Sequence, residues 1–414
     1  MASESTCVSI QFNDLDEDSL VHIFSFLSLE DLDRLARVCH RFYIVITVHL
    51  FSRLSARLLL TGHQSKAAHY PSRNVIEFDF RRRISLYENW RYGRYQENQF
   101  FQHRMLYFSQ ILLEKRWLYM SHRGQLRVHK RTVERGLLRV KPSWTVGAEK
   151  NADINWMVKK GEVIFAGRAD GSGFVYDCRK RRYSKQVLAD DIVTAVDFDG
   201  DLFVSTSKSS STCFWTAVVD NGECALDRRL EIPEAYQTIK LSPDGGSRLA
   251  AGKYHDRAKN ALRLMDVERG FSTVLNSPSR AVYHLLWKDQ NTILTGNFDT
   301  TMRMVDTRTA QDEAVWSDPY DASVYCLDYD GAYGVLCGLK QHFRVNLYDL
   351  RAPRRCVQMY FSPRKTTNYS PVYSLAADSS QLFIVTDHDL RVLNFDADHA
   401  ESKDYTHDLD RWFY

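Results

Sequence analysis

Residues 281–310, AVYHLLWKDQNTILTGNFDTTMRMVDTRTA, contain the pattern that decides the fold. Apolar and polar residues alternate in TILTG and again in TMRMV, so each short segment would turn one face to a core and the other to water. Residues 296–299, GNFD, separate the two segments and are typical of a tight hairpin. The stretch therefore predicts two antiparallel strands, which alone would bury too little surface to be stable.

The same layout recurs along the chain at intervals of 39 to 50 residues. In each copy a polar residue, such as Asp306, ends the second strand-like segment, and the residue before it serves as a marker. The seven markers are His129, Tyr176, Trp215, Met265, Val305, Tyr348 and Leu393. This period resembles the WD repeat, in which four antiparallel strands form one blade of a β-propeller. A β-sandwich, the alternative fold, would give turn signals about every 8 to 12 residues without the longer period. We therefore predict a mainly β protein with a seven-bladed propeller, its blades at about 109–146, 153–189, 191–230, 235–275, 281–316, 323–361 and 371–397.

The two ends of the propeller segment indicate how the ring closes. Closure removes the exposed edge of a sheet, and residues 99–107, which precede the first blade, are predicted to supply the outer strand of the last blade. The propeller would then span residues 99–397, with a C-terminal tail at 398–414 outside it. Two insertions, at 218–230 and 253–260, lengthen the third and fourth blades, and such loops on a rigid scaffold are common recognition sites.

Composition limits the function classes. The 414 residues carry 55 basic and 52 acidic side chains, a net charge of +3 that gives no support for a nucleic-acid partner. No secretory signal or membrane-spanning apolar run is visible, so we expect no membrane partner and an intracellular location, cytoplasmic or nuclear. The eight cysteines form no CxxC pair and the fourteen histidines no HExxH pattern, so we expect neither a metal site nor a cofactor.

Residues 14–42, DLDEDSLVHIFSFLSLEDLDRLARVCHRF, are predicted to be helical. One apolar face recurs at helical spacing in a first helix, and a second helix begins at Ser28, where Ser28 and Asp31 resemble a capping box. Helices in only about 40 residues are too few to enclose a core. Their apolar faces are therefore expected to cover another surface, either the propeller or a partner chain.

This segment resembles the F-box family, most clearly at DLDRLARVC, residues 31–39. Two positions depart from the family pattern: Asp16 replaces a proline, which we expect to loosen the helix entry, and Phe42 replaces a tryptophan. The resemblance implies helices that bind the Skp adaptor of a cullin-RING ubiquitin ligase by inserting apolar side chains into a groove. The adaptor-binding residues so implied are Leu15, Leu20, Ile23, Phe24, Leu27, Leu32, Leu35, Val38, Cys39 and Phe42.

The domain order that follows is a disordered N-terminus at 1–13, F-box helices at 14–60, with the last helix ending near Gly62, and a linker at 61–98. The linker contains ENWRYGRYQE, residues 88–97, which together with the F-box, the repeats and SPVYSL at 370–375 resembles the family of F-box/WD repeat-containing protein 4 (dactylin). Stacking of Trp90, Tyr92 and Tyr95 on neighbouring arginines would fix the F-box to the propeller.

The sequence contains no catalytic motif, so the chain is expected to be a non-catalytic protein. In WD-repeat receptors the turns between second and third strands commonly bind peptides. Cations in those turns would form a rim able to bind phosphate or carboxylate, although solvated surface charges would look the same in sequence. The substrate-binding residues predicted there are Arg168, Lys208, Lys253, Tyr254, Asn297, Phe298 and Lys340.

Together these features predict the substrate-recognition subunit of an SCF-type ubiquitin ligase, which marks a protein target for proteasomal degradation. The F-box would bind the Skp adaptor, and through it the cullin and RING subunits. The alternative is a WD-repeat scaffold without a role in ubiquitin transfer.

Overall fold

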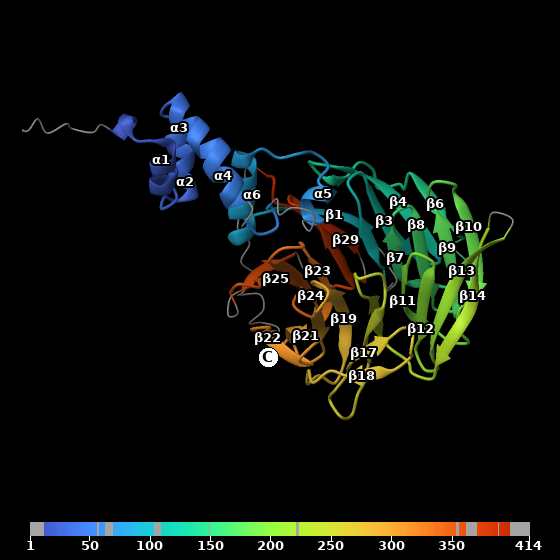
Figure 1. Ribbon diagram of the computed structural model, residues 1–414. Helices are drawn as coiled ribbons and strands as arrows, with labels where there is room; N and C mark the ends of the chain where they lie inside the picture. The colour runs from blue at the N-terminus through green and yellow to red at the C-terminus, as the bar shows by residue number, and fades with distance from the viewer. Residues whose placement is uncertain are drawn as a thin grey trace, which may run out of the picture.

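The protein is described by a computed structural model over residues 12–55, 58–62, 69–102, 109–148, 150–220, 223–352, 356–361, 371–387 and 389–397. Seven antiparallel sheets surround a common axis, and a small group of helices lies to one side of the ring (Figure 1). The predicted fold, a seven-bladed propeller with an N-terminal helical region, is therefore confirmed. The predicted tail at 398–414 lies outside the described residues.

The first four blades follow the chain in order. Blade 1 contains β2 (Ile111–Leu113), β3 (Trp117–His122), β4 (Gln125–Thr132), β5 (Gly136–Leu137) and β6 (Trp144–Val146). Blade 2 contains β7 (Ile154–Lys160), β8 (Val163–Arg168), β9 (Ser172–Asp177) and β10 (Arg182–Val187). Blade 3 contains β11 (Val193–Asp199), β12 (Leu202–Ser207), β13 (Thr212–Asp220) and β14 (Glu223–Ile232). Blade 4 contains β15 (Thr238–Leu241), β16 (Arg248–Gly252), β17 (Leu262–Asp266) and β18 (Ser272–Val274).

The last three blades complete the ring. Blade 5 contains β19 (Val282–Trp287), β20 (Thr292–Asn297), β21 (Thr301–Asp306) and β22 (Gln311–Ser317). Blade 6 contains β23 (Val324–Tyr329), β24 (Gly334–Leu339), β25 (Arg344–Asp349) and β26 (Cys356–Tyr360). Blade 7 contains β27 (Ser374–Ala377), β28 (Gln381–Val385), β29 (Asp389–Asn394) and, as its fourth strand, β1 (Gln96–Gln102).

The seven marker residues occupy one structural position. Each lies on the third strand of its blade, is buried, and pairs with an apolar residue of the second strand, as Val305 pairs with Ile293. The hairpin predicted at residues 296–299 falls slightly later, because Gly296 and Asn297 still belong to β20. A Cβ at Gly296 would lie 2.8 Å from Val324 Cγ1, so this glycine permits close packing of blades 5 and 6.

The predicted closure of the ring is also found. β1 pairs antiparallel with β29 along its length, so a strand that precedes blade 1 completes blade 7. Glu97 forms a buried salt bridge with Arg391 of β29, which fixes the register of the two strands. Residues 103–107, the rest of the predicted strand, lie outside the described part of the chain.

The helices are η1 (Phe12–Asp14), α1 (Glu17–Phe24), α2 (Leu29–Ala36), α3 (His40–Ile44), the π-helix η2 (Val45–Leu50), α4 (Phe51–Ser55), α5 (His69–Arg73) and α6 (Phe80–Arg91). Two sequence predictions differ from this. The helix expected to end near Gly62 ends at Ser55, and the segment expected to be a linker, 61–98, contains α5 and α6 as well as the start of β1. Part of the predicted disordered N-terminus is the short helix η1, while residues 1–11 lie outside the described residues.

Candidate functional site

The N-terminal helices enclose a hydrophobic core of their own, contrary to prediction. Its members are Leu20, Phe24, Leu32, Ala36, Phe42, Val45, Ile46, Leu50 and Phe51, each with at most 6 % of its surface exposed. The prediction considered only residues 14–42. The core is completed by η2 and α4, which follow in sequence, and by Phe80 and Ile84 of α6, which pack against it.

Side-chain caps define where α1 and α2 begin. Asp16 accepts a hydrogen bond from the backbone N–H of Ser19 (2.6 Å), and this bond, which favours the ionised carboxylate, lowers the pKa of Asp16. The departure from proline at this position therefore does not loosen the helix entry, because aspartate is itself an N-cap. Ser28 accepts from Asp31 N–H (3.1 Å) at the start of α2, as the capping pattern predicted.

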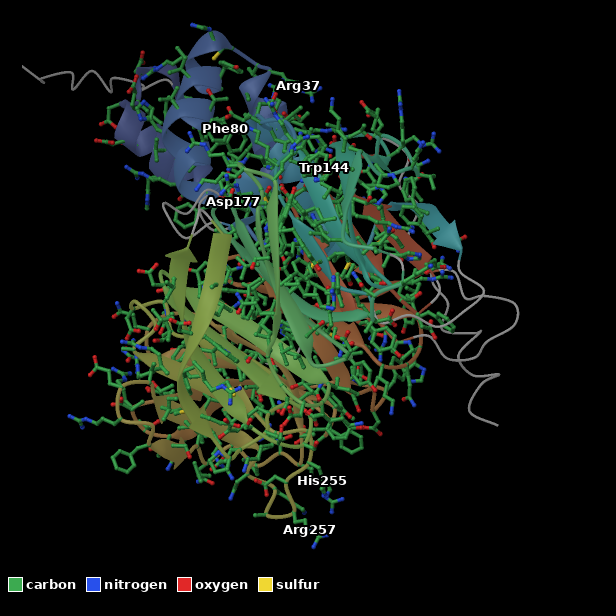
Figure 2. The ribbon with its side chains drawn as sticks, turned by 90° about the vertical axis from the view of Figure 1, so that its right-hand side faces the viewer. Arg37, Phe80, Trp144, Asp177, His255 and Arg257 are labelled. Atoms are coloured by element: carbon green, nitrogen blue, oxygen red, sulfur yellow. The ribbon has the colours of Figure 1, made fainter. Side chains whose placement is uncertain are left out.

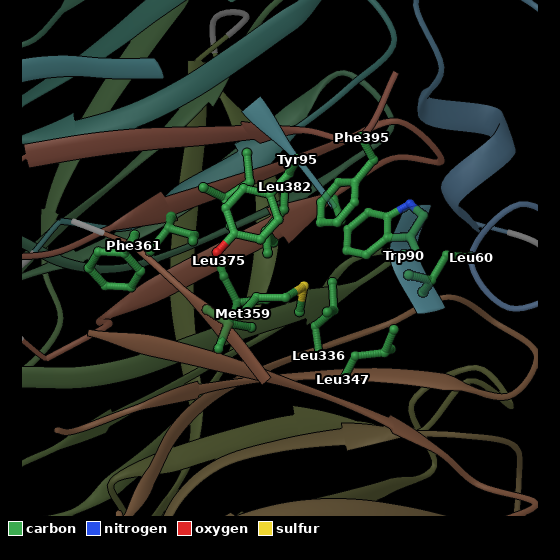
Figure 3. Packing of buried hydrophobic residues seen from close by; sticks show 14 of the residues in the cluster. Leu60, Trp90, Tyr95, Leu336, Leu347, Met359, Phe361, Leu375, Leu382 and Phe395 are labelled. Carbon is green, nitrogen blue, oxygen red and sulfur yellow. The ribbon is translucent and has the colours of Figure 1, made fainter. Parts of the chain in front are cut away.

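Helix α6 connects the helical core to the propeller. Its Trp90 is fully buried and stacks on Phe395 (Figure 3), with ring centroids 3.5 Å apart. Trp90 Nε1 donates to the carbonyl oxygen of Ser379 (2.8 Å). Tyr95, also buried, donates its hydroxyl to the carbonyl oxygen of Tyr360. The predicted aromatic anchor thus exists, but Trp90 stacks on phenylalanine; it is Tyr92, half exposed, whose ring lies under two arginines.

A second connection runs through the segment before α6. Arg73 of α5 donates to Asp328 Oδ2 (2.8 Å) of blade 6 and to the carbonyl oxygen of Ala377 (3.0 Å) of blade 7. Leu60 N–H donates to Asp330 Oδ2 (3.0 Å), and burial raises the pKa of Asp330. A Cβ at Gly334 would lie only 2.7 Å from Leu60 Cδ2, so this glycine permits the close approach of the segment to the propeller.

The propeller has two faces, distinguished by its turns. Turns between first and second strands contact those between third and fourth strands, as when Thr307 N–H donates to Asn291 O (2.8 Å). Turns between second and third strands contact the links between blades, as when Phe298 N–H donates to Ala281 O (3.0 Å). The helices attach to the first set, which forms the helix-bearing face. The second set of turns forms the opposite face, which we call the far face. In Figure 2, Arg37 and Phe80 of the helices lie at one end of the molecule, and His255 and Arg257 of the far face lie at the other.

The predicted cationic rim lies on this far face but is not a continuous set of available cations. Arg168 is completely buried, donates to Tyr183 Oη (2.8 Å), and lies over the ring of Phe174. Lys253 forms a salt bridge with Glu234 (3.3 Å), and Lys340 is half-buried. The rim prediction is therefore wrong for Arg168, whose guanidinium is held by Tyr183 of its own blade and donates to the carbonyl oxygen of Gly124 (3.4 Å) in blade 1.

The other predicted substrate-binding residues are divided in the same way. Asn297 is buried and its amide nitrogen donates to Thr295 Oγ1 (3.0 Å), so it holds the turn and is not available at the surface. Lys208, Tyr254 and Phe298 are exposed. Of the predicted set, these three present side chains at the far face most fully.

A row of aromatic side chains crosses blades 4 to 7 on the far face. Tyr283 lies at the centre, with ring centroids 6.0 Å from Tyr254, 6.1 Å from Phe298 and 4.7 Å from Tyr325, and Tyr325 lies 6.1 Å from Tyr373. Sequence reasoning predicted Tyr254 but missed the other three tyrosines of this row, Tyr283, Tyr325 and Tyr373. A signal was present, because each follows a valine at the start of its blade, in AVY, SVY and PVY.

Comparison with known proteins agrees with this architecture. Residues 12–57 match the F-box-like family model. The chain is 25% identical over 388 residues to F-box/WD repeat-containing protein 4 of Homo sapiens, and 26% identical over 389 residues to the protein of the same name from Mus musculus, with 92% of each chain covered. Both are homologues of this chain. The predicted resemblance to the family of F-box/WD repeat-containing protein 4 is thus confirmed.

Within the F-box-like domain, the ten predicted adaptor-binding residues fall into three groups. Leu20, Phe24, Leu32 and Phe42 are buried in the domain core. Leu15 and Leu35 are half-buried against that core. Ile23, Leu27, Val38 and Cys39 are exposed. The four buried residues stabilise the domain core and cannot contact a partner. Of the ten residues, the four exposed ones and the accessible parts of the two half-buried ones are available to a partner.

Further apolar side chains of this domain are exposed and were not predicted as contacts. They are Phe12, Phe26, Tyr43, Ile44 and Val48, with 48 %, 76 %, 44 %, 36 % and 57 % of their surfaces exposed. Helical spacing selects the residues that face the domain core, so it cannot select these. The signal available in the sequence was the opposite one, namely large apolar residues on the otherwise polar side of a short helix.

No group of three or more His, Cys, Asp or Glu side chains within the described residues is arranged to hold a metal ion. The seven described cysteines are not joined in disulfides. No helix among the described residues is long and apolar enough to cross a membrane.

Proposed function

We propose that this chain is the substrate receptor of an SCF-type ubiquitin ligase. Its F-box-like domain binds the Skp adaptor, which brings the cullin and RING subunits, and its propeller binds the protein to be modified. The chain supplies no catalytic group. Its contribution is to hold a target lysine near a charged ubiquitin carrier, so that transfer becomes effectively intramolecular.

The observation that carries this proposal is the exposed apolar surface of a domain whose core is already complete. Phe26 and Val38, which follow the ends of α1 and α2, are 76 % and 67 % exposed, although Leu20 and Leu32 within those helices are fully buried. Exposed apolar side chains in this number on so small a domain are typical of a protein interface.

Exposed positions allow a test that leaves the domain folded. We expect Phe26→Asp with Val38→Asp to abolish recovery of the adaptor in a pull-down, because a charge would enter an apolar contact. Phe271→Asp, at a propeller position that is 74 % exposed, is the matched control and should retain the adaptor. Substitution of Leu32 would not be informative, since it is buried and its loss would unfold the domain.

If the native chain recovers no adaptor, the chain is a WD-repeat scaffold without a ligase role. If Phe26→Asp with Val38→Asp recovers as much adaptor as the control, the adaptor does not bind at these exposed side chains. Target binding is assigned to the far face, where Tyr254 and Phe298 lie beside Tyr283. Proximity labelling that compares the native chain with Tyr254→Ala, Phe298→Ala should lose specific proteins while adaptor labelling is unchanged.

A further inference from the structure

The helix-bearing face of blades 1 and 2 carries a concentration of exposed cations. We call this the basic surface, and its residues are Lys115, Arg116, Lys130, Arg135, Arg139, Lys141, Arg179, Lys180 and Arg181. All lie at strand ends or in turns of the set to which the helices attach. Trp144 and Asp177, which flank these turns, lie toward the helices and away from His255 and Arg257 in Figure 2.

Contacts between blades make this surface continuous. Lys130 pairs across the sheet with Trp117, whose ring meets that of Trp144 edge-on at 4.7 Å. The guanidinium of Arg181, from blade 2, lies 5.9 Å from the centroid of the Trp144 ring of blade 1. The cations of the two blades therefore belong to one patch.

The charge of the basic surface is not neutralised within the described part of the protein. None of the nine cations forms a salt bridge with a described residue, whereas Lys159 and Lys160, on the neighbouring strand, both do. Among the described residues next to these cations, Glu134 is exposed, while Glu114, beside Lys115, is already paired with Lys159. Asp177 is occupied, since its Oδ1 accepts from the backbone N–H groups of Arg179 (2.9 Å) and Lys180 (2.8 Å).

Two further observations favour a protein over a nucleic acid as the partner of the basic surface. The aromatic rings in the patch, Trp117 and Trp144, are half-buried and packed on each other and under Arg181, so they offer no open face on which a nucleic-acid base could stack. Leu138 and Val140, between the cations, are 50 % and 56 % exposed. Apolar side chains among arginines suit a polypeptide in which acidic and apolar residues are interspersed.

We infer that the basic surface is a second interaction site, which binds an acidic protein segment containing apolar residues. Its arginines would pair with carboxylates, and Leu138 and Val140 would contact the apolar residues of the segment. The site is separate from the exposed apolar side chains of the F-box-like domain and from the far face. It lies on the face that carries that domain, so a protein bound there would be held beside whatever the domain binds.

The test uses the full chain and a fluorescent peptide in which glutamates are interspersed with leucines, followed by polarisation. Arg139→Glu, Arg179→Glu, Arg181→Glu should weaken binding tenfold or more. The matched control, Arg257→Glu, Lys259→Glu, Arg280→Glu, makes the same charge change at exposed positions of the far face and should bind as the native chain does. Thermal melting of both variants checks that each remains folded.

The proposal is overturned if the native chain does not bind the peptide, or if the two variants lose affinity equally, which would indicate nonspecific attraction. It is also overturned in favour of a nucleic-acid site if a single-stranded oligonucleotide binds more tightly than the peptide and the basic-surface variant loses that binding. Adaptor recovery is measured in parallel. It should be the same in all three proteins, so failure here is distinguishable from failure of the proposed ligase role.

Discussion

His129 is a buried histidine at a position where most other blades have a larger or wholly apolar side chain. It is fully buried on β4, and the ring of Phe101 lies 5.2 Å away. Burial disfavours the charged imidazolium and lowers the pKa of His129 from 6.5 to about 4. The folded protein thus keeps this side chain neutral at a pH where the unfolded chain takes up a proton.

This difference predicts a pH dependence of stability. Between about pH 6.5 and about pH 4 the unfolded state binds more protons at this residue than the folded state does. The free energy of unfolding should therefore fall as the pH is lowered through this window, by at most about 1.4 kcal/mol per pH unit from this group. Chemical denaturation at several pH values gives the slope of the free energy of unfolding against pH. This slope should be smaller in His129→Phe than in the native chain.

His255 provides the control, because it is exposed on the loop of blade 4. His255→Phe should leave the slope as it is in the native chain. If His129→Phe also leaves it unchanged, the buried imidazole does not contribute to the acid sensitivity.

Among the elements, α6 is the one that joins the two cores of the molecule. Its N-terminal Phe80 packs on the core of the F-box-like domain, while Trp90, near its other end, is buried in the propeller core formed by blades 6 and 7. A helix anchored at both ends transmits the orientation of one part to the other. Sequence reasoning placed this segment within a linker, residues 61–98, in which Pro71 and Ser72 are typical of a loop.

We expect Trp90→Ala to lower the free energy of unfolding of the propeller by about 3–5 kcal/mol, as is typical when a buried aromatic side chain is removed. It would also remove the hydrogen bond to Ser379. Trp90→Phe should recover most of this loss, since the stack on Phe395 is kept. Tyr92→Ala, at a half-exposed neighbour, should change stability little, and calorimetry of the three variants decides between these outcomes.

The strands were predictable because their signal is local. The pattern of TILTG and TMRMV placed β20 and β21, and the marker at Val305 has a counterpart in every blade. The expectation that one face of each strand meets water is wrong, because neighbouring blades cover both faces of these inner strands. The functional surfaces were less predictable because they depend on contacts between distant segments. Arg168 looked like a surface cation in sequence, and only its packing on Phe174 and Tyr183 shows that it is structural.

At the scale of the molecule, the exposed apolar surface of the F-box-like domain and the far face have no residue in common and lie on opposite sides of the propeller. Binding of a partner at one of these surfaces should not alter the affinity of the other surface for its own partner, because no described residue belongs to both surfaces. Their relation is therefore geometric. The contacts between the F-box-like domain and α6 include the packing of Phe80 on Phe51, with ring centroids 5.9 Å apart, the packing of Ile84 on the same core, and the ion pair of Arg81 with Asp33 (3.0 Å).

Phe80→Ala with Arg81→Ala should release the F-box-like domain from α6 while each part keeps its own core. Small-angle scattering should then show a broader range of dimensions, and recovery of adaptor and target should be unchanged. If the chain acts as proposed, ubiquitin transfer to the target should fall several-fold, because the target lysine would spend less time near the charged carrier. Arg91→Ala, an exposed change elsewhere on α6, controls for substitution in that helix. If scattering shows that the domain is released while ubiquitin transfer continues at the native rate, a fixed orientation of the two parts is not needed for function.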